Sequence, residues 1–329
     1  MKTIIYTCPY VPAEWIAAHG LHPFRLSLDH TEPDSALART EGLCPFVRCF
    51  IGEVMNNTRA DGVIVTTVCD QMRRAFDILV RKCQLPAFLM NVPSTWQSFE
   101  SQRLYIDELK RLGRFLTKLG GNSPSNNALA KVMLEYDSAR KAILAAREYL
   151  SARRYAEAIA SLYRDGPDKT PDSPTSTESS VDGIHLAIIG GPLMKQDFDL
   201  FDVIEQSGGR VVLDATETGE RGLCAPFDRR RLHDEPLMEL ADAYFIGIND
   251  ASRRPNSGLY KWLQQKIASR TVQGIIFRRY VWCDLWHAEV QRLKDWSNLP
   301  VLDIDTGGDN DNERQRTANR IRAFLEMLQ

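Results

Sequence analysis

The sequence predicts an α/β fold in which two Rossmann-like parallel-sheet domains face each other, with a helical insert between them in the chain. Short apolar runs alternate with segments of helical spacing in the first ninety residues and again from residue 184 onward. The segment between these two halves is helical in pattern almost throughout. We therefore expect a first α/β domain at residues 1–95, a helical insert at 96–165, a linker at 166–182 and a second α/β domain at 183–329.

Three apolar runs in the first domain predict parallel strands at residues 2–6, 62–66 and 87–91. The stretches at 44–55 and 70–82 have the spacing of crossover helices. Pro86 and Pro93 flank the third run and mark its ends.

The insert is rich in Ala and Leu over residues 96–163 and is broken once, at Gly120 to Pro124, which predicts a helical hairpin or a helical cap. Residues 165–182 are rich in Pro, Ser, Thr and Asp and have no apolar period, which is typical of a linker. Strand–helix alternation then resumes. We expect strands at 184–189, 210–213, 243–248, 274–277 and 301–304, and helices at 197–206, 260–269 and 313–328.

Composition excludes several classes of function. The chain has 329 residues, of which 43% are hydrophobic, enough for two cores. Its formal net charge of -2 provides no basic stripe for a phosphate backbone, so nucleic acid is not an expected partner. The first residues lack the pattern of a signal peptide, and no apolar run is long enough to cross a bilayer. We therefore expect a cytoplasmic protein with no membrane partner.

Cysteines are the strongest chemical signal. In a reducing compartment they are more often buried, catalytic or metal-bound than paired in disulfides. Ligands of parallel sheets bind beyond the carboxyl ends of the strands. Four cysteines stand at such places: Cys8, Cys69 and Cys283 follow predicted strands, and Cys224 lies in the loop after residue 213. Cys44 opens a helix after a glycine turn, where the helix dipole favours its thiolate.

Thiolates contributed by separate loops favour an iron–sulfur cluster, because structural zinc sites usually show paired spacings such as CxxC, which this sequence lacks. The alternative for each cysteine taken singly is an ordinary core position. We assign that role to Cys83, in the segment RKCQLPAF. Cys49 is ambiguous, since it follows Cys44 by five residues, off the ideal spacing for one helical face.

Several segments resemble successive blocks of the 2-hydroxyacyl-CoA dehydratase and benzoyl-CoA reductase family, over almost the whole chain. They include GLCPFVRCF, DGVIVTTVCDQMRRAFD, GGRVVLDATETGERG, GIIFRRYVWCD and NLPVLDIDTGGD. The resemblance implies a 4Fe-4S cluster held by Cys44, Cys69 and Cys283. Some relatives carry a double-cubane cluster of eight irons that needs six cysteines, a number that Cys8, Cys224 and Cys49 would complete.

The resemblance also implies a reaction and partners. In the family, an ATP-hydrolysing activator supplies one low-potential electron, and the cluster passes it to an acyl-CoA thioester to form a ketyl radical, before dehydration or ring reduction. It further implies a homologous subunit, in a homodimer or a heterodimer. The alternatives are a non-catalytic electron-transfer or structural subunit, a double-cubane reductase of small molecules, and a zinc-binding or metal-free two-lobed binding protein.

No catalytic side chain follows from the family blocks. His287 is a candidate because it follows Cys283 by one helical turn, although a packed helix histidine fits the same pattern. Asp214, Glu217 and Arg221 lie beyond a predicted strand end, where they either bind substrate or pair with one another. The pairs Arg73–Arg74 and Arg278–Arg279 either attract CoA phosphates or the activator, or are simply solvated.

Overall fold

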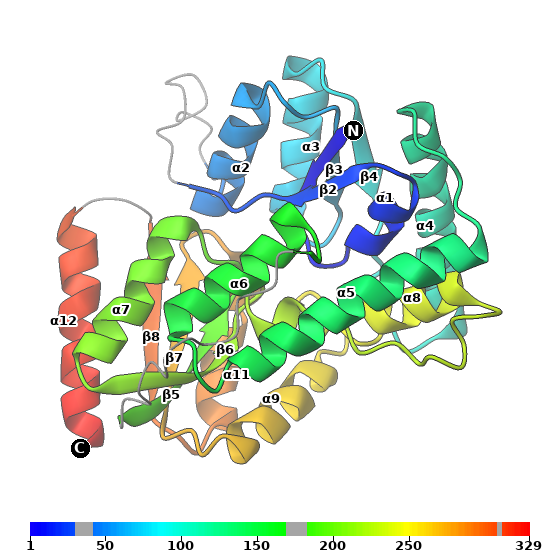
Figure 1. Cartoon of the computed structure of the whole chain (residues 1–329). Coiled ribbons are helices and arrows are strands. Elements are labelled where there is room, and N and C mark those ends of the chain that lie inside the picture. The colour runs from blue at the N-terminus through cyan, green and yellow to red at the C-terminus, as the bar shows by residue number, and fades with distance from the viewer. Residues whose placement is uncertain (30–41, 169–182, 308–310) are drawn as a thin grey trace.

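The computed structural model describes residues 1–29, 42–168, 183–307 and 311–329, and these form two four-stranded parallel sheets (Figure 1). The first sheet has the order β2-β1-β3-β4 and the second the order β6-β5-β7-β8. The predicted α/β fold with two parallel-sheet domains is confirmed. The predicted linker lies outside the described residues from residue 169 to its end. The strands are β1 (Thr3–Tyr6), β2 (His22–Arg25), β3 (Gly62–Thr66), β4 (Ala87–Met90), β5 (Ile184–Gly190), β6 (Gly209–Ala215), β7 (Gly274–Tyr280) and β8 (Val301–Thr306).

The first sheet is covered on one face by α2 (Pro45–Asn56) and α3 (Asp70–Lys82), whose apolar sides pack against the side chains of β1 and β3. Two short elements were not predicted, namely α1 (Ala13–Ala18) and the edge strand β2. They contain six and four residues, too few for a periodic pattern to appear in the sequence.

The insert contains three helices, α4 (Phe99–Lys118), α5 (Asn126–Ala146) and α6 (Ala152–Asp165), so the prediction of a single break is wrong. The additional break arises because a new helix begins after Ser151, whose hydroxyl accepts a hydrogen bond from the backbone of Arg154. Helix α6 packs against β2 of the first sheet and β6 of the second. The insert therefore joins the two sheets.

The second sheet is surrounded by helices of the C-terminal half (Figure 1). They are α7 (Asp199–Gln206), α9 (Ser257–Ser269), α10 (Asp284–His287), α11 (Glu289–Trp296) and α12 (Asp311–Leu328), with the 3-10 turns η1 (Lys195–Phe198) and η2 (Glu220–Gly222). The remaining helix of this half, α8 (Pro236–Phe245), lies against the insert.

The strand predicted at residues 243–248 is wrong, because α8 extends to Phe245. Its buried residues include Pro236, Leu240, Ala243 and Tyr244, a helical spacing, and proline at the first turn favours helix initiation. The helix packs against α4 and α5 instead of joining the sheet. A short apolar run at the end of a helix resembles a buried strand when its preceding residues are not considered.

A buried ion pair connects α1, α5 and α8. An Arg140 nitrogen lies 2.5 Å from a Glu14 oxygen, and the hydroxyl of Tyr244 donates to the other Glu14 oxygen at 2.6 Å. The side chains of Glu14 and Arg140 are 0% and 3% exposed. Because a buried charge without a partner is costly, the three helices depend on one another at this point.

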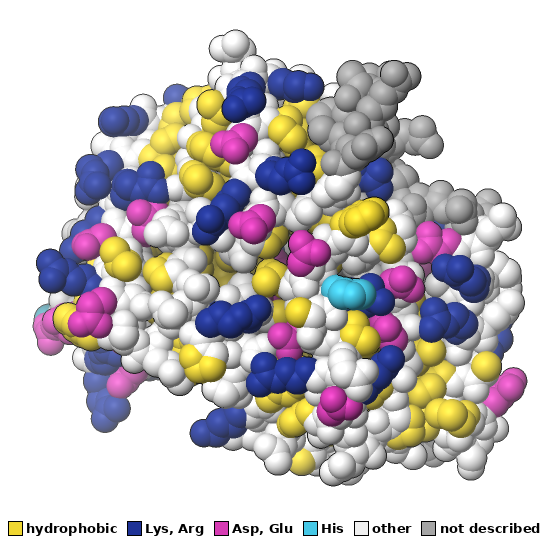
Figure 2. Space-filling model, turned by 180° about the vertical axis from the view of Figure 1, so that it is seen from behind, with side chains coloured by type: hydrophobic (Ala, Val, Ile, Leu, Met, Phe, Trp, Pro, Cys, Tyr) yellow, Lys and Arg dark blue, Asp and Glu magenta, His cyan; other side chains and the backbone are white. Residues whose placement is uncertain are grey.

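Charged side chains are intermixed on the face shown in Figure 2, where Lys and Arg alternate with Asp and Glu. The described part of this face shows no stripe of a single sign.

We expect Arg140→Met to lower the free energy of unfolding by about 3–5 kcal/mol, because it leaves the Glu14 carboxylate buried and unpaired. Urea denaturation of the purified protein measures this change. The matched control is Arg230→Met, which removes an ion pair with Asp228 in which the arginine side chain is 90% exposed, and we expect it to leave the free energy of unfolding unchanged within experimental error. Equal effects of the two substitutions would contradict the role given to the buried pair.

Candidate functional site

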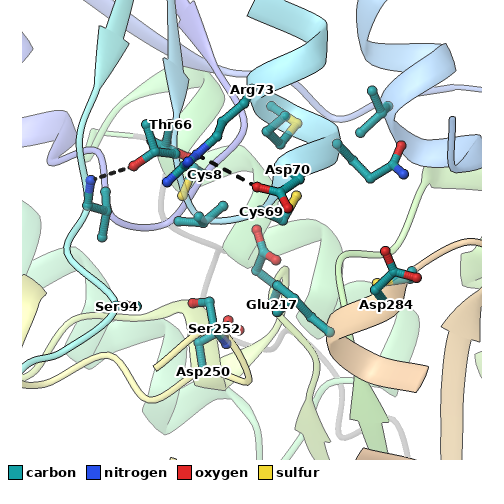
Figure 3. Close-up of a pocket in the computed structure, with 18 of the residues that line it drawn as sticks. Cys8, Thr66, Cys69, Asp70, Arg73, Ser94, Glu217, Asp250, Ser252 and Asp284 are labelled. Carbon is teal, nitrogen blue, oxygen red and sulfur yellow. Dashed lines mark hydrogen bonds and ion pairs between the residues drawn. The ribbon is translucent and has the colours of Figure 1, made fainter. Parts of the chain in front are cut away.

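The carboxyl ends of the two sheets border one cavity of about 610 Å³. Its first wall is formed by residues that follow β1, β3 and β4 and by the start of α2. Its second wall is formed by residues that follow β5, β6 and β7 and by the loop between α8 and α9. The cavity therefore lies where parallel sheets bind ligands, at the crevice beyond the strand ends (Figure 3).

Cys44, Cys69 and Cys283 line this cavity, and each immediately precedes a helix, respectively α2, α3 and α10. The three side chains interact electrostatically: Cys44 with both others, and Cys69 with Cys283. Burial raises the pKa of Cys44 and Cys69 to about 12 and that of Cys283 to about 11. First-turn backbone N–H groups act in the opposite direction on all three. Because these pKa values lie well above neutral pH, the three thiols would lose their protons near pH 7 only when a metal cation binds the sulfur atoms.

Cys44, Cys69 and Cys283 offer only sulfur donors, the ligand type of iron–sulfur clusters and of many zinc sites. Within the described ranges, no group of three or more His, Cys, Asp or Glu side chains is arranged to hold a single metal ion. The three cysteine thiols are instead distributed around a cavity, one from the end of each of three loops. A structural zinc ion needs its ligands to converge on one point, whereas an iron–sulfur cluster takes one thiolate at each of several irons.

Cys8 also lines the cavity but has different neighbours. Burial raises its pKa, the charge of Glu217 adds to this increase, and a hydrogen bond with Thr66 and the charge of Arg25 oppose it. Figure 3 shows Cys8 on the side of the cavity next to Thr66, away from Asp284. It is therefore placed to face a ligand of the cavity from the first sheet.

The remaining candidate cysteines lie elsewhere. Cys224 is buried in the core shared by the first sheet and the insert, where its thiol interacts with Arg140, Glu14 and Tyr244. Cys49 is 2% exposed and packs within α2 under the first sheet. Neither lines the cavity. Cys83, assigned from the sequence to the core, follows α3 and is partly buried.

His287, the catalytic candidate from the sequence, is the last residue of α10 and is exposed. It is not among the residues that line the cavity. Its backbone N–H donates to the carbonyl of Cys283 at 2.8 Å, so it continues the helix that Cys283 begins. The imidazole of His287 therefore does not reach the cavity, and only its backbone contacts Cys283.

Two carboxylates of the second wall have opposite pKa shifts. Burial and the charge of Asp250 raise the pKa of Glu217 to about 7. Burial alone would raise the pKa of Asp250, but the charge of Arg221 and hydrogen bonds from Ser252 outweigh it and lower that pKa. Figure 3 shows Glu217 reaching into the cavity toward Cys69, with Asp250 and Ser252 below it. Such a divided pair is typical of proton-transfer sites.

Arg221 holds this wall together from underneath. Its side chain is fully buried, and its guanidinium donates to the carbonyls of Ala215 at 2.9 Å and Gly190 at 2.7 Å. It also lies 2.5 Å from an Asp250 oxygen and 4.8 Å from the centre of the Trp286 ring. One side chain therefore fixes the ends of β5 and β6, the loop before α9 and helix α10.

The other polar residues named from the sequence have mixed positions. Asp214 is buried and accepts hydrogen bonds from the backbone and hydroxyl of Thr216, so it shapes the loop after β6. Arg73 lines the cavity, 4.0 Å from Asp70. Arg278 is buried outside the cavity. Sequence reasoning missed Asp250 and Ser252, for which the only local signal is an Asp-x-Ser turn, with the Ser252 N–H donating to Asp250 at 2.8 Å.

We expect the free energy of unfolding of metal-free Glu217→Gln, taken relative to that of the metal-free wild type at the same pH, to be higher at pH 8 than at pH 5. The folded pKa of about 7 lies above the ordinary value of 4.5, so the folded state binds the proton more tightly than the unfolded chain. The wild type therefore loses stability as the pH rises through this range, and the glutamine variant lacks this loss. Urea denaturation at the two pH values measures the difference. The matched control is Glu148→Gln, at an exposed position. The raised pKa of Glu217 would be contradicted if the stability difference between Glu217→Gln and the wild type did not increase from pH 5 to pH 8, or if Glu148→Gln showed the same increase.

The chain matches a known protein family over nearly its whole length. The family model for the 2-hydroxyglutaryl-CoA dehydratase D-component matches residues 8–328. No curated protein matches the chain. Among solved structures, the SBP FpvC from Pseudomonas aeruginosa in complex with Mn²⁺ aligns at 14% identity over 100% of this chain and 98% of that chain, with a TM-score of 0.25, too low to support an argument. In the described residues, no helix has both the length and the apolar character needed to span a membrane.

Proposed function

Because this chain belongs to the family of the 2-hydroxyglutaryl-CoA dehydratase D-component, a dehydratase-like family, we propose that it is an iron–sulfur-dependent 2-hydroxyacyl-CoA dehydratase subunit. The observation that carries this proposal is the arrangement of Cys44, Cys69 and Cys283 around one cavity that both sheets share.

Cys44, Cys69 and Cys283 would hold a 4Fe-4S cluster. When bound, the cluster would supply one low-potential electron to the acyl thioester. The first-turn backbone N–H groups of Val47, Met72 and Trp286, which favour the charged form of these thiols, would stabilise the negative charge on the sulfur ligands.

Cys8 is the further cysteine best placed to assist, since it lines the same cavity. The double-cubane alternative needs Cys224 and Cys49 as well, and both lie outside the cavity. This placement favours a single cluster of four irons over a cluster of eight.

The cavity suits the acyl end of a substrate. Phe46, Val47, Leu285 and Trp286 provide apolar surface that excludes water, while the hydroxyls of Ser94 and Ser252 are placed to contact a 2-hydroxyl or carbonyl group. Figure 3 shows Ser94 and Ser252 on the same side of the cavity. A volume of about 610 Å³ holds an acyl group and leaves the rest of a CoA ester outside.

Glu217 would move the proton in the elimination. Dehydration of a 2-hydroxyacyl group removes a β-hydrogen and releases the hydroxyl as water, so it needs a group that accepts one proton and gives one back. The raised pKa of Glu217 and its position in the cavity suit this role. Asp250, bound to Arg221, would stay ionised, and its negative charge would keep the pKa of Glu217 raised.

The expected partners are an ATP-hydrolysing activator that delivers the electron and a homologous subunit, in a homodimer or a heterodimer. The description of the family as a D-component supports a system of several proteins. A cytoplasmic location fits free cysteines, since the described structure contains seven of them and a reducing compartment keeps them available.

We expect anaerobically purified protein to contain about four irons and four acid-labile sulfides per chain. Cys44→Ala, Cys69→Ala and Cys283→Ala should each remove most of this iron, because each deletes one ligand of the cluster. Iron and sulfide assays with the visible spectrum measure the change. The control variants Cys83→Ala and Cys224→Ala should keep their iron, since neither thiol lines the cavity. Iron-free protein, or iron that survives in all three ligand variants, would contradict the ligand assignment.

In an assay of 2-hydroxyacyl-CoA dehydration with activator and ATP, we expect Glu217→Gln to lower kcat by ~10²–10⁴-fold with its iron content unchanged. The control Glu148→Gln, at an exposed position between α5 and α6, should retain wild-type activity. Full activity of Glu217→Gln would exclude its role in proton transfer. An iron-loaded but inactive wild type would favour the non-catalytic electron-transfer subunit.

A further inference from the structure

A second cavity, of about 430 Å³, lies between α7 and α12 on one face of the second sheet. Figure 1 shows these two helices side by side, and they pack against each other. No residue that lines this cavity also lines the cavity of the cysteines. The proposed function leaves it unused.

The interior of this second cavity is apolar. Leu200 and Val203 come from α7, Ile304 from β8, and Ala318 and Ile321 from α12. Ile304 and Ile321 belong to the core beneath the cavity. A small molecule with an apolar or aromatic body would therefore bury that body against these side chains.

The acidic side chains of the second cavity already have partners. Asp197 lies 2.5 Å from Arg278, and Asp199 lies 2.6 Å from Arg153, which is not part of the cavity lining. Glu313 accepts a hydrogen bond from the backbone N–H of Gly307 at 2.8 Å. The negative charges of this cavity are therefore engaged in contacts within the protein.

Its arginines leave positive charge and donors available. Arg314 and Arg322 form no ion pair within the described part of the chain, and Arg322 makes a hydrogen bond to Asn319 at 3.0 Å. Arg278 is 2% exposed, and its Nη atoms donate to Asp197, Thr306 and the carbonyl of Pro192. Its guanidinium also lies 3.7 Å from the centre of the Tyr280 ring, so Arg278 lines the inner part of the cavity with its charge compensated by Asp197.

We propose that this second cavity binds a small amphipathic anion, a molecule with an apolar or aromatic body and a carboxylate, sulfonate or phosphate group. The apolar side chains of α7, β8 and α12 hold the body, and the guanidinium groups of Arg314 and Arg322 hold the charged group.

The test uses fluorescence titration with 8-anilinonaphthalene-1-sulfonate, an aromatic sulfonate, and with N-phenyl-1-naphthylamine, the same ring system without the sulfonate. The full-length wild type should bind both probes at one site. The variant Arg314→Gln/Arg322→Gln should bind the sulfonate about tenfold more weakly, and the neutral probe as the wild type does. Val203→Trp should abolish binding of both, because the larger side chain fills the cavity.

The matched control is Arg316→Gln, an exposed arginine of the same helix that does not line the cavity, and it should bind both probes as the wild type does. Far-UV circular dichroism checks that each variant is folded. The proposal is overturned if the wild type does not bind the sulfonate, if the double variant and the Arg316→Gln control bind it equally, or if folded Val203→Trp binds both probes normally. Since no arm measures iron or activity, these results are independent of the proposed dehydratase function.

Discussion

The buried guanidinium of Arg221 is the contact on which the geometry of the cysteine cavity depends most. It joins the carbonyl ends of β5 and β6 to the Asp250 carboxylate and lies against the ring of Trp286. Glu217 stands four residues before it on the same loop, and Cys283 stands three residues before Trp286. A carboxylate with a raised pKa and a proposed metal ligand are thus positioned by one fully buried cation, whose own charge is compensated by Asp250.

Burial explains the chemistry of both walls. It raises the pKa of the three helix-preceding thiols and of Glu217 for the same reason, since each charged form is poorly solvated there. For the thiols this means that a metal must replace the proton. For Glu217 it means that the carboxyl group gains and loses a proton near neutral pH. The same burial would keep water away from a substrate in the cavity.

The sequence was most informative where a pattern is local. Buried apolar runs such as 62–66 and 184–189 predict strands. Cysteines that directly follow strands are predicted to lie at the carboxyl ends of the sheets, where ligands bind. It was least informative where position depends on distant partners. The loop containing Asp250 has no period, and its place follows from Arg221, 29 residues away. The apolar run at 243–248 was assigned to a strand because the helical spacing that identifies α8 begins earlier, at Pro236.

The central claim is that Cys44, Cys69 and Cys283 together hold one iron–sulfur cluster between the two sheets. The most direct measurement is an anomalous difference map at the iron absorption edge, from crystals of the anaerobically reconstituted protein. Our account predicts one compact iron peak bounded by these three sulfur atoms, within the cavity that Glu217 faces. An iron peak centred on Cys224 or Cys49, or a map with no iron in this cavity, would contradict it.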